Sequence, residues 1–307
     1  MRTDEYYASK GAGQIHVCRW MPEKSPVAVL QIIHGIAEYA ERYDDFARYM
    51  NDLGYIVVAE DHMGHGKSIN EEGVQGYFHG GWFTAVEDSY QLLQDTRKRY
   101  PDLPYVLLGH SMGSFMTRTL LCVHPDSGIS AVVICGTGWQ PRAILNIGIA
   151  ACSVVCKAGD EKKPNDRLQN LVFSGYNKRV EHVQTPFDWI CRDRNVVTAY
   201  MNDPFCGFTA SGGLLREMLK GIRFIQEPKN LAAMEKKLPV LFIAGGDDPV
   251  GSYGKGVRRA AAAFQKAGMQ DVTCKIYPLG RHEILNEINK QEVYADVSSW
   301  FQKKLNK

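Results

Sequence analysis

The sequence Gly-His-Ser-Met-Gly at residues 109–113 places the strongest constraint on how this chain can fold. The apolar run Tyr105–Leu108 before it has the length of a buried strand, and apolar residues recur at helical spacing from Phe115 to His124. A G-x-S-x-G motif at a strand-to-helix turn needs its two glycines, because larger side chains would clash in so sharp a turn. The turn exposes the Ser111 hydroxyl beside a helix N-terminus, which carries a partial positive charge.

Apolar runs and amphipathic segments alternate along much of the chain. Near-continuous apolar runs are typical of strands that helices cover on both faces. We therefore predict an α/β fold with a doubly wound, mostly parallel sheet. The expected strands are Gln14–Trp20, Val27–Ile33, Tyr55–Glu60, Tyr105–Leu108, Ala131–Cys135, Pro239–Ala244 and Val272–Pro278, and the expected helices are Glu41–Leu53, Trp82–Tyr100, Tyr253–Gly268 and Gln291–Leu305.

This alternation stops after the strand at Ala131–Cys135. Helical segments without a clear strand follow as far as about residue 230, and the strand–helix order then resumes. We predict a helical cap, or lid, at 137–230, inserted between two parts of one core at 1–136 and 231–307. A lid excludes water from an active site and shapes its pocket, although a helical subdomain that only stabilises the fold would have the same pattern.

A serine hydroxyl is a weak nucleophile, which needs a general base and a group that orients this base. Two aspartates, Asp247 and Asp248, follow one late strand, and His282 follows the last strand. Serine, acid and histidine in this chain order are known for G-x-S-x-G enzymes with a sheet of this kind. Because loops after parallel strands meet at one edge of a sheet, we predict a catalytic triad of Ser111, Asp248 and His282, with Asp247 as the alternative acid.

The oxyanion formed during acyl transfer needs backbone N–H donors in a site that excludes water. We predict the N–H of Met112, next to the serine, and the N–H of Ile36, in the loop after an early strand. A plain turn at the end of that strand is the alternative.

The neighbours that we expect to support the site are His34, Gly35, Gly109, His110 and Gly113. The histidines that compete with His282 as the base are His34, His62, His65 and His110, and the chain order disfavours all of them.

Composition argues against several other classes of protein. The net charge is +2 over 307 residues, without a long basic run, so we expect no nucleic-acid partner. We expect no signal peptide and no run of about 18 apolar residues that could span a membrane. The eight cysteines are scattered, and several, such as Cys18 and Cys274, lie in apolar segments. We interpret these as small buried residues, and we expect free thiols, no metal and a cytoplasmic protein.

Short motifs along nearly the whole chain match one known family. In the order of that family they are His34-Gly35-x-x-Glu38, Asp61-x-x-Gly64-x-Gly66-x-Ser68, the Ser111 motif, Asn202-Asp203-Pro204, Gly245-x-x-Asp248 and His282-Glu283. With these motifs the sequence resembles the monoglyceride lipase and lysophospholipase branch of the α/β-hydrolase superfamily, which is related to serine aminopeptidase-type hydrolases.

The resemblance implies an α/β-hydrolase fold with a helical lid, a serine triad, no cofactor, and hydrolysis of single-acyl lipid esters such as monoacylglycerols or lysophospholipids. It favours Asp248 over Asp247, because the acid of the family stands at the end of G-x-x-D. Two residues depart from the usual H-G-x-G-E-H loop, since Ala37 and Tyr39 replace its second glycine and its last histidine.

Other activities would use the same triad. An aminopeptidase or amidase would need a lid carboxylate to hold the ammonium group of its substrate, and the candidates are Asp160, Glu161 and Glu181. A small-molecule esterase or an acyltransferase would need no further residue. A ligand receptor without catalysis would be expected to lack a member of the triad, and all three candidates are present.

The apolar segment Ala143–Cys156 bears on the substrate. We expect it to line an acyl-chain pocket, with Ile147 and Ile149 as the lining residues, or to make transient contact with a membrane surface. Packing against the core is the alternative.

Overall fold

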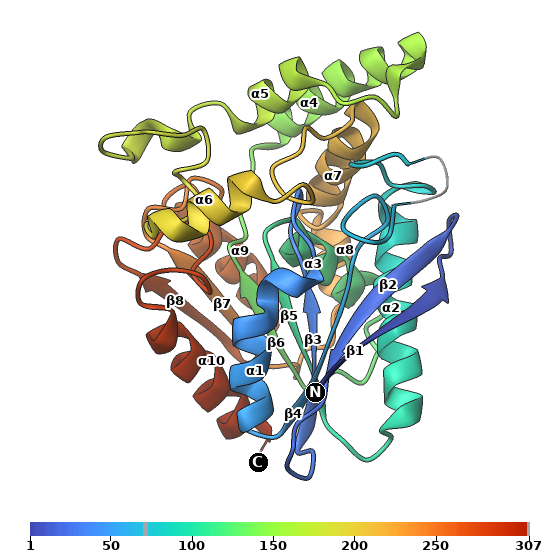
Figure 1. The fold of residues 1–307 in the computed structure, drawn as a ribbon, viewed down its shortest axis with the longest axis vertical. Helices are drawn as coiled ribbons and strands as arrows, with labels where there is room; N and C mark the ends of the chain where they lie inside the picture. Colours follow the sequence, from blue (N-terminus) through green and yellow to red (C-terminus); the bar gives the residue numbers. More distant parts are fainter. Residues whose placement is uncertain (70–72, 306–307) are drawn as a thin grey trace.

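The computed structural model describes residues 1–69 and 73–305, and in this part of the chain a sheet of eight strands forms the centre (Figure 1). The strand order is β1-β2-β4-β3-β5-β6-β7-β8; β2 is antiparallel to both of its neighbours, and the other pairs are parallel. The predicted doubly wound, mostly parallel sheet is therefore confirmed. The strands are β1 (Arg2–Ala8), β2 (Gln14–Trp20), β3 (Ala28–Ile33), β4 (Tyr55–Glu60), β5 (Tyr105–His110), β6 (Ala131–Cys135), β7 (Val240–Gly245) and β8 (Val272–Tyr277).

Helices cover both faces of this sheet, and alternate residues of each strand therefore enter different cores. In β3, Leu30 and Ile32 pack towards α1 (Asp44–Asp52) and α10 (Lys290–Leu305). Val29 and Ile33 face the other way, into a larger core. Among the helices that contribute side chains to it are α2 (Gly81–Arg99), α3 (Met112–Val123) and α9 (Lys255–Lys266). Burial on both faces explains why β3 to β7 are almost continuously apolar in sequence.

Further helices connect β6 to β7, in the segment predicted to be an insertion. In Figure 1, α4 and α5 lie across the top of the molecule, and residues from both line a cavity that reaches Ser111. The helices are α4 (Arg142–Val155), a π-helical turn η2 (Cys156–Asp160), α5 (Asp166–Phe173), a 3₁₀ turn η3 (Tyr176–Arg179), α6 (Arg194–Asn202), α7 (Gly212–Phe224) and α8 (Pro228–Ala233).

Several local predictions differ from the structure. The edge strand β1 was missed, because most of its side chains are exposed and it has no apolar run. The helix expected at Glu41–Leu53 is divided into a 3₁₀ turn, η1 (Ala40–Tyr43), and α1. Helix α6 begins at Arg194, where the Asp193 side chain caps it by accepting from the N–H of Asn195. Residues 70–72 and 306–307 of the two predicted core segments lie outside the described part of the chain.

The stretch Arg142–Asp160 corrects another expectation. It has 19 residues and is apolar enough, by length and composition alone, to cross a membrane. Polar residues, among them Asn146 and Ser153, interrupt the stretch, so it is not a continuous apolar run. Most of the stretch is not buried, but Leu145 and Cys152 are buried and belong to the larger core cluster. This helix therefore has an inner apolar face and an outer apolar face.

Candidate active site

Ser111 lies in a strained turn between β5 and α3. Its φ of 52° and ψ of −120° fall in a region that side-chain-bearing residues rarely adopt. A Cβ atom at Gly109 would lie 2.2 Å from Oγ1 of Thr117, and one at Gly113 would lie 2.0 Å from the carbonyl oxygen of Ile33. Both glycines are therefore required by the close approach of neighbouring atoms, as the motif predicts. The turn holds the serine at the junction of two cavities.

The loops after β7 and β8 bring Asp248 and His282 together. Nδ1 of His282 lies 3.0 Å from Oδ1 of Asp248, which also accepts a hydrogen bond of 2.9 Å from the N–H of Val250. The His282 contact has an ion-pair distance but not hydrogen-bond geometry, and such contacts often tighten only when substrate binds. Asp248 is fully buried, whereas Asp247 is partly exposed and its N–H donates to the carbonyl of Gly280. The geometry thus favours Asp248 over Asp247 as the acid beside His282.

Two cavities meet at Ser111. The first, of about 470 Å³, also contains His282 and has several polar groups in its wall. The second, of about 450 Å³, is mostly apolar and extends beneath α4 and α5. The side chains common to both are Ile36, Ser111, Phe173 and Tyr176. A molecule whose reacting carbon lies at the serine can therefore extend in two directions, one of which is lined by more polar side chains than the other.

The predicted oxyanion residues lie at this junction. Ile36 lines both cavities, and Met112 lines the apolar one. Of the two lid residues expected at an acyl pocket, Ile147 lines the apolar cavity. Ile149 packs against the core cluster instead, so its assignment to the pocket was wrong. The catalytic roles of Ser111 and its partners stay predictions. The structure places Asp248 beside His282, and it places His282 and Ser111 in the wall of the same cavity.

Glu38 is a buried carboxylate that joins the oxyanion loop to the serine turn. Its Oε1 atom accepts hydrogen bonds from the N–H of Gly35 at 2.6 Å and from the hydroxyl of Tyr43 at 2.9 Å. The same atom lies 3.0 Å from Nδ1 of His110, the residue before the serine. A single carboxylate therefore fixes the position of two predicted supporting residues, Gly35 and His110.

Arg42 extends this network to the histidine loop, and it belongs to none of the motifs identified in the sequence. Its guanidinium donates to Oε2 of Glu38 at 2.9 Å and makes two bonds, of 2.7 and 2.8 Å, to the carboxylate of Glu283. Glu283 follows His282, so the arginine connects the oxyanion loop to the loop of the predicted base. The only signal in the sequence is that both of its carboxylate partners stand in family motifs.

The charges in this network stabilise one another. Burial would raise the pKa of Glu38, but the hydrogen bond and charge of His110, together with the charge of Arg42, hold it well below its usual range. Burial would lower the pKa of His110, but the hydrogen bond and charge of Glu38 raise it above its ordinary value. Glu38 is therefore ionised in the folded protein, and His110 keeps its proton to higher pH than a free histidine.

The remaining candidate histidines pack against one another away from the predicted triad. His34 and His62 stack with ring centroids 3.9 Å apart, and His65 lies beside them. Burial lowers the pKa of His65 to about 3 and the pKa of His34 well below its ordinary value. His34 donates from Nδ1 to the carbonyl of Gly35 and accepts at Nε2 from the N–H of His62. The neutral ring of His34 thus connects the oxyanion loop to the loop after β4.

We expect Glu38→Gln to destabilise the fold by about 3 kcal/mol, because it leaves the buried Arg42 and His110 without their shared counter-ion. The pKa of His110 is raised by folding, so its contribution to stability is complete below its unfolded value and is lost as pH rises through its folded value. Urea unfolding at about pH 6 and about pH 9 should show this loss in the wild type and not in the variant.

The control is Glu87→Gln, because Glu87 pairs with His124 in a partly exposed site. Its expected cost is below about 1 kcal/mol. Equal losses of stability in Glu38→Gln and Glu87→Gln would contradict the inference that the Glu38 network stabilises the site.

Comparison with known proteins agrees with this fold. The family model "Serine aminopeptidase, S33" matches residues 24–289. The chain is 29% identical to a monoacylglycerol lipase of Mycolicibacterium smegmatis, over 97% of this chain and 96% of that protein. It is also 29% identical to a monoglyceride lipase of Homo sapiens, over 94% of this chain and 87% of that protein. Among solved structures, it is similar to a carboxyl esterase from Bacillus coagulans, with a TM-score of 0.92, 28% identity and 99% coverage of both chains.

The fold and these similarities define an α/β hydrolase. The chain belongs to the serine aminopeptidase S33 family, and the resemblance to the monoglyceride lipase branch that its motifs predict is confirmed. It is a serine hydrolase of carboxylic esters.

Proposed function

We propose that this enzyme hydrolyses single-acyl lipid esters, such as monoacylglycerols or lysophospholipids, through an acyl-enzyme on Ser111. The observation that carries the proposal is the pair of cavities that meet at this serine, one lined almost entirely by apolar side chains and the other by several polar side chains as well. The acyl chain would occupy the apolar cavity, and the alcohol part of the ester would occupy the more polar one. Relatives named monoacylglycerol lipase support the same class of substrate.

In this mechanism, Oγ of Ser111 attacks the ester carbonyl while His282 takes the hydroxyl proton. Asp248 holds the His282 ring in the required tautomer and stabilises its cation. The N–H groups of Ile36 and Met112 stabilise the tetrahedral oxyanion. His282 then protonates the leaving alcohol, and a water molecule activated by the same histidine cleaves the acyl-enzyme to release the fatty acid.

The walls of the apolar cavity favour a long acyl chain. Its volume, about 450 Å³, lies within the range of roughly 300–1,000 Å³ that is typical of small-molecule pockets. The side chains that line it come from α3, α4, α5 and α7, among them Phe115, Leu145, Val172, Met218 and Ile222. The segment 137–230 thus supplies much of the cavity wall, which supports a role for it as a lid.

The carboxylates that an aminopeptidase would need are engaged elsewhere. Asp160 pairs with Lys163 at 2.6 Å, and Glu161 pairs with Arg216. Glu181 is exposed, and none of the three carboxylates lines either cavity in the described part of the chain. An ester with an uncharged acyl group therefore fits this site better than a peptide with a free amino terminus.

A bulky residue in the apolar cavity should select against long acyl chains. We expect Val172→Trp on α5 to lower kcat/KM for long-chain p-nitrophenyl esters by about 10- to 100-fold and to leave the acetyl ester nearly unchanged. The matched control is Arg167→Trp on the same helix, whose side chain lines neither cavity. An equal effect of Val172→Trp on acetyl and long-chain esters would contradict the assignment of this cavity to the acyl chain.

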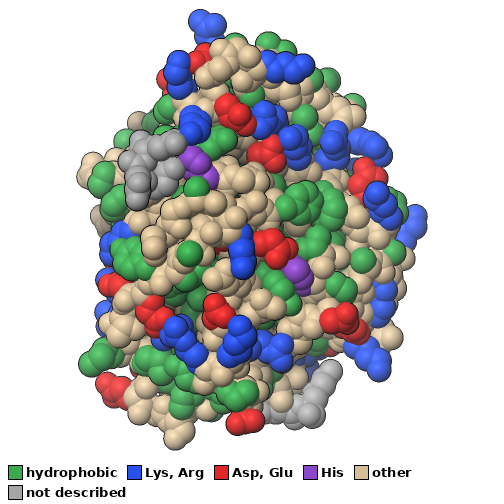
Figure 2. Space-filling view, turned by 90° about the vertical axis from the view of Figure 1, so that its right-hand side faces the viewer, with side chains coloured by type: hydrophobic (Ala, Val, Ile, Leu, Met, Phe, Trp, Pro, Cys, Tyr) green, Lys and Arg blue, Asp and Glu red, His purple; other side chains and the backbone are tan. Residues whose placement is uncertain are grey.

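The outer face of the lid fits a transient contact with a membrane surface, as part of the same proposal. Ile144, Ile147, Val154 and Leu171 are each more than half exposed, and all of them except Val154 also line the apolar cavity. Basic side chains, with acidic ones among them, lie near the top of the molecule, at the lid end, as Figure 2 shows. Exposed apolar and basic groups together favour an anionic lipid surface. A cytoplasmic location, consistent with eight free thiols, would give access to the inner surface of such a membrane.

Vesicle binding tests this contact. We expect wild-type enzyme to bind vesicles that contain phosphatidylserine more tightly than neutral vesicles, and Val154→Asp to weaken this binding by about 10-fold, because it removes an apolar contact and adds a like charge. Val154 lines neither cavity, so turnover of soluble esters should not change. The control is Val27→Asp, which alters a similarly exposed valine outside the lid. Equal binding by all three proteins would reject a specific contact through the lid.

A further inference from the structure

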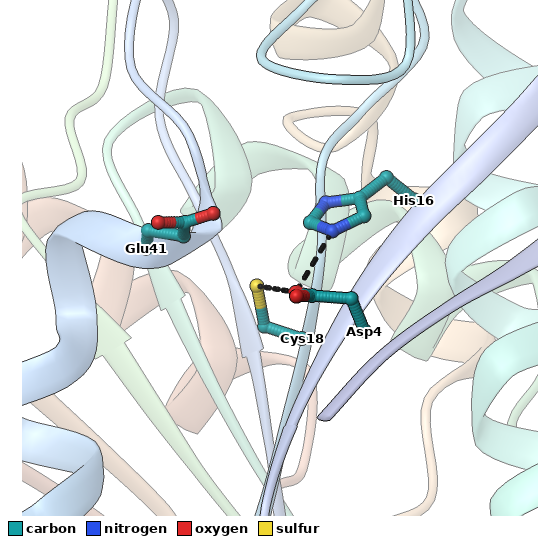
Figure 3. A group of neighbouring side chains, drawn as sticks. All are labelled: Asp4, His16, Cys18 and Glu41. Atoms are coloured by element: carbon teal, nitrogen blue, oxygen red, sulfur yellow. Dashed lines mark hydrogen bonds and ion pairs between the residues drawn. The ribbon is translucent and has the colours of Figure 1, made fainter. Parts of the chain in front are cut away.

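Four side chains with metal-ligand chemistry gather at the edge of the sheet (Figure 3). Asp4 on β1 lies opposite Cys18 on β2, His16 points to the same side, and Glu41 approaches from the 3₁₀ turn η1. One donor atom from each residue lies within 4.8 Å of all the others. None of the four lines either cavity at Ser111, so the cluster is distinct from the proposed active site.

The buried imidazole of His16 lies between two carboxylates. Its Nδ1 is 2.8 Å from Oδ2 of Asp61, and its Nε2 is 3.1 Å from Oδ1 of Asp4. Asp61 is fixed, because it is fully buried and accepts hydrogen bonds from the N–H groups of Ala40 and Lys67. A neutral imidazole has one N–H, so when Nδ1 donates to Asp61, Nε2 presents a lone pair to Asp4. Two acceptors that face each other at this distance require a proton or a metal cation between them.

We propose that Asp4, His16 and Cys18 bind one Zn²⁺, with Glu41 or a water molecule as the fourth ligand. An imidazole, a thiolate and a carboxylate form a donor set that suits Zn²⁺, whereas Mg²⁺ and Ca²⁺ prefer oxygen ligands alone. Asp61 would support this ligand, because metal-binding histidines commonly donate the N–H of their other ring nitrogen to a carboxylate. On binding, Cys18 releases its thiol proton to solvent, and any proton shared by His16 and Asp4 is released as well.

The surrounding charges explain why Glu41 is the exchangeable ligand. Its two carboxylate oxygens already pair with Arg2, at 3.0 Å, and with Lys67, at 2.5 Å. Asp4 turns one oxygen towards the cluster, and its other oxygen lies 3.8 Å from Arg2. The Asp4 side chain is 41% exposed, which gives the ion a path from solvent. A bound ion would tie β1 and β2 to η1, the turn that follows the oxyanion loop.

Metal binding and spectroscopy test this site without reference to catalysis. After treatment with EDTA, the wild-type chain is titrated with ZnCl₂ against a chromophoric chelator, and with Co²⁺ while the thiolate-to-cobalt charge-transfer band is recorded. We expect about one Zn²⁺ per chain, a cobalt–thiolate band, and a melting temperature that rises with Zn²⁺. Cys18→Ser should abolish the band, and Asp4→Asn should weaken Zn²⁺ binding by about 10-fold or more.

The control is Cys156→Ser, which removes a half-buried thiol on the lid and should change neither the band nor the affinity. Because Asp4 is partly exposed, Asp4→Asn is expected to fold. It therefore tests Zn²⁺ binding even where Cys18→Ser does not fold. Less than stoichiometric binding by the wild type, a cobalt–thiolate band that persists in Cys18→Ser, or unchanged affinity in Asp4→Asn would overturn the proposal.

Discussion

Replacing Ser111 with alanine is expected to lower kcat/KM for p-nitrophenyl esters by about 10⁴-fold or more, with the fold unchanged. The variant loses the nucleophile but keeps the two cavities and the backbone donors beside it, so substrate binding should persist. The measurement is a series of esters from acetyl to palmitoyl, with the melting temperature as a check on folding. The matched control is Ser174→Ala, because Ser174 also lines the polar cavity.

The chain-length profile separates the candidate substrates. Activity that depends on Ser111 and rises towards palmitoyl supports a lipid ester. Activity confined to short esters keeps the same nucleophile and indicates a small-molecule esterase. Residual turnover in Ser111→Ala that matches the Ser174→Ala control would contradict the assignment of Ser111 as the nucleophile.

The strands that could be predicted from the sequence are those whose side chains are buried on both faces of the sheet. Strands β3 to β7 are covered by helices on both faces, so each one is a continuous apolar run in the sequence. Strand β1 is different, because it lies at the edge of the sheet and is held by its pairing with β2, from Arg2↔Trp20 to Ala8↔Gln14. Helices α5 and α8 have eight and six residues, which is too short for a clear helical periodicity.

The residues of the candidate site could be predicted from the sequence where the order of the strands alone determines where a side chain lies. Residues in loops after parallel strands meet at one edge of the sheet, which explains why Ser111, Asp248 and His282 could be selected together. Arg42 could not be selected in this way, because its importance depends on Glu283, which is 241 residues away in the chain. The cluster of Asp4 and His16 was missed for a similar reason, since its ligand geometry exists only once β1 pairs with β2.

Asp248→Asn is expected to lower kcat by about 10⁴-fold, whereas Asp247→Asn should have an effect of less than about 10-fold. An asparagine at 248 fits the same space but removes the charge that stabilises the His282 cation, and it favours the wrong tautomer of the ring. The side chain of Asp248 is buried 3.0 Å from His282, while the neighbouring aspartate is partly exposed.

The two variants change adjacent residues by the same chemical step, so an effect of general charge near the site would reduce activity in both. A loss that is confined to Asp248→Asn requires the direct contact with His282. Equal losses, or a larger loss in Asp247→Asn, would assign the acid to Asp247 and would mean that the loop after β7 rearranges when substrate binds.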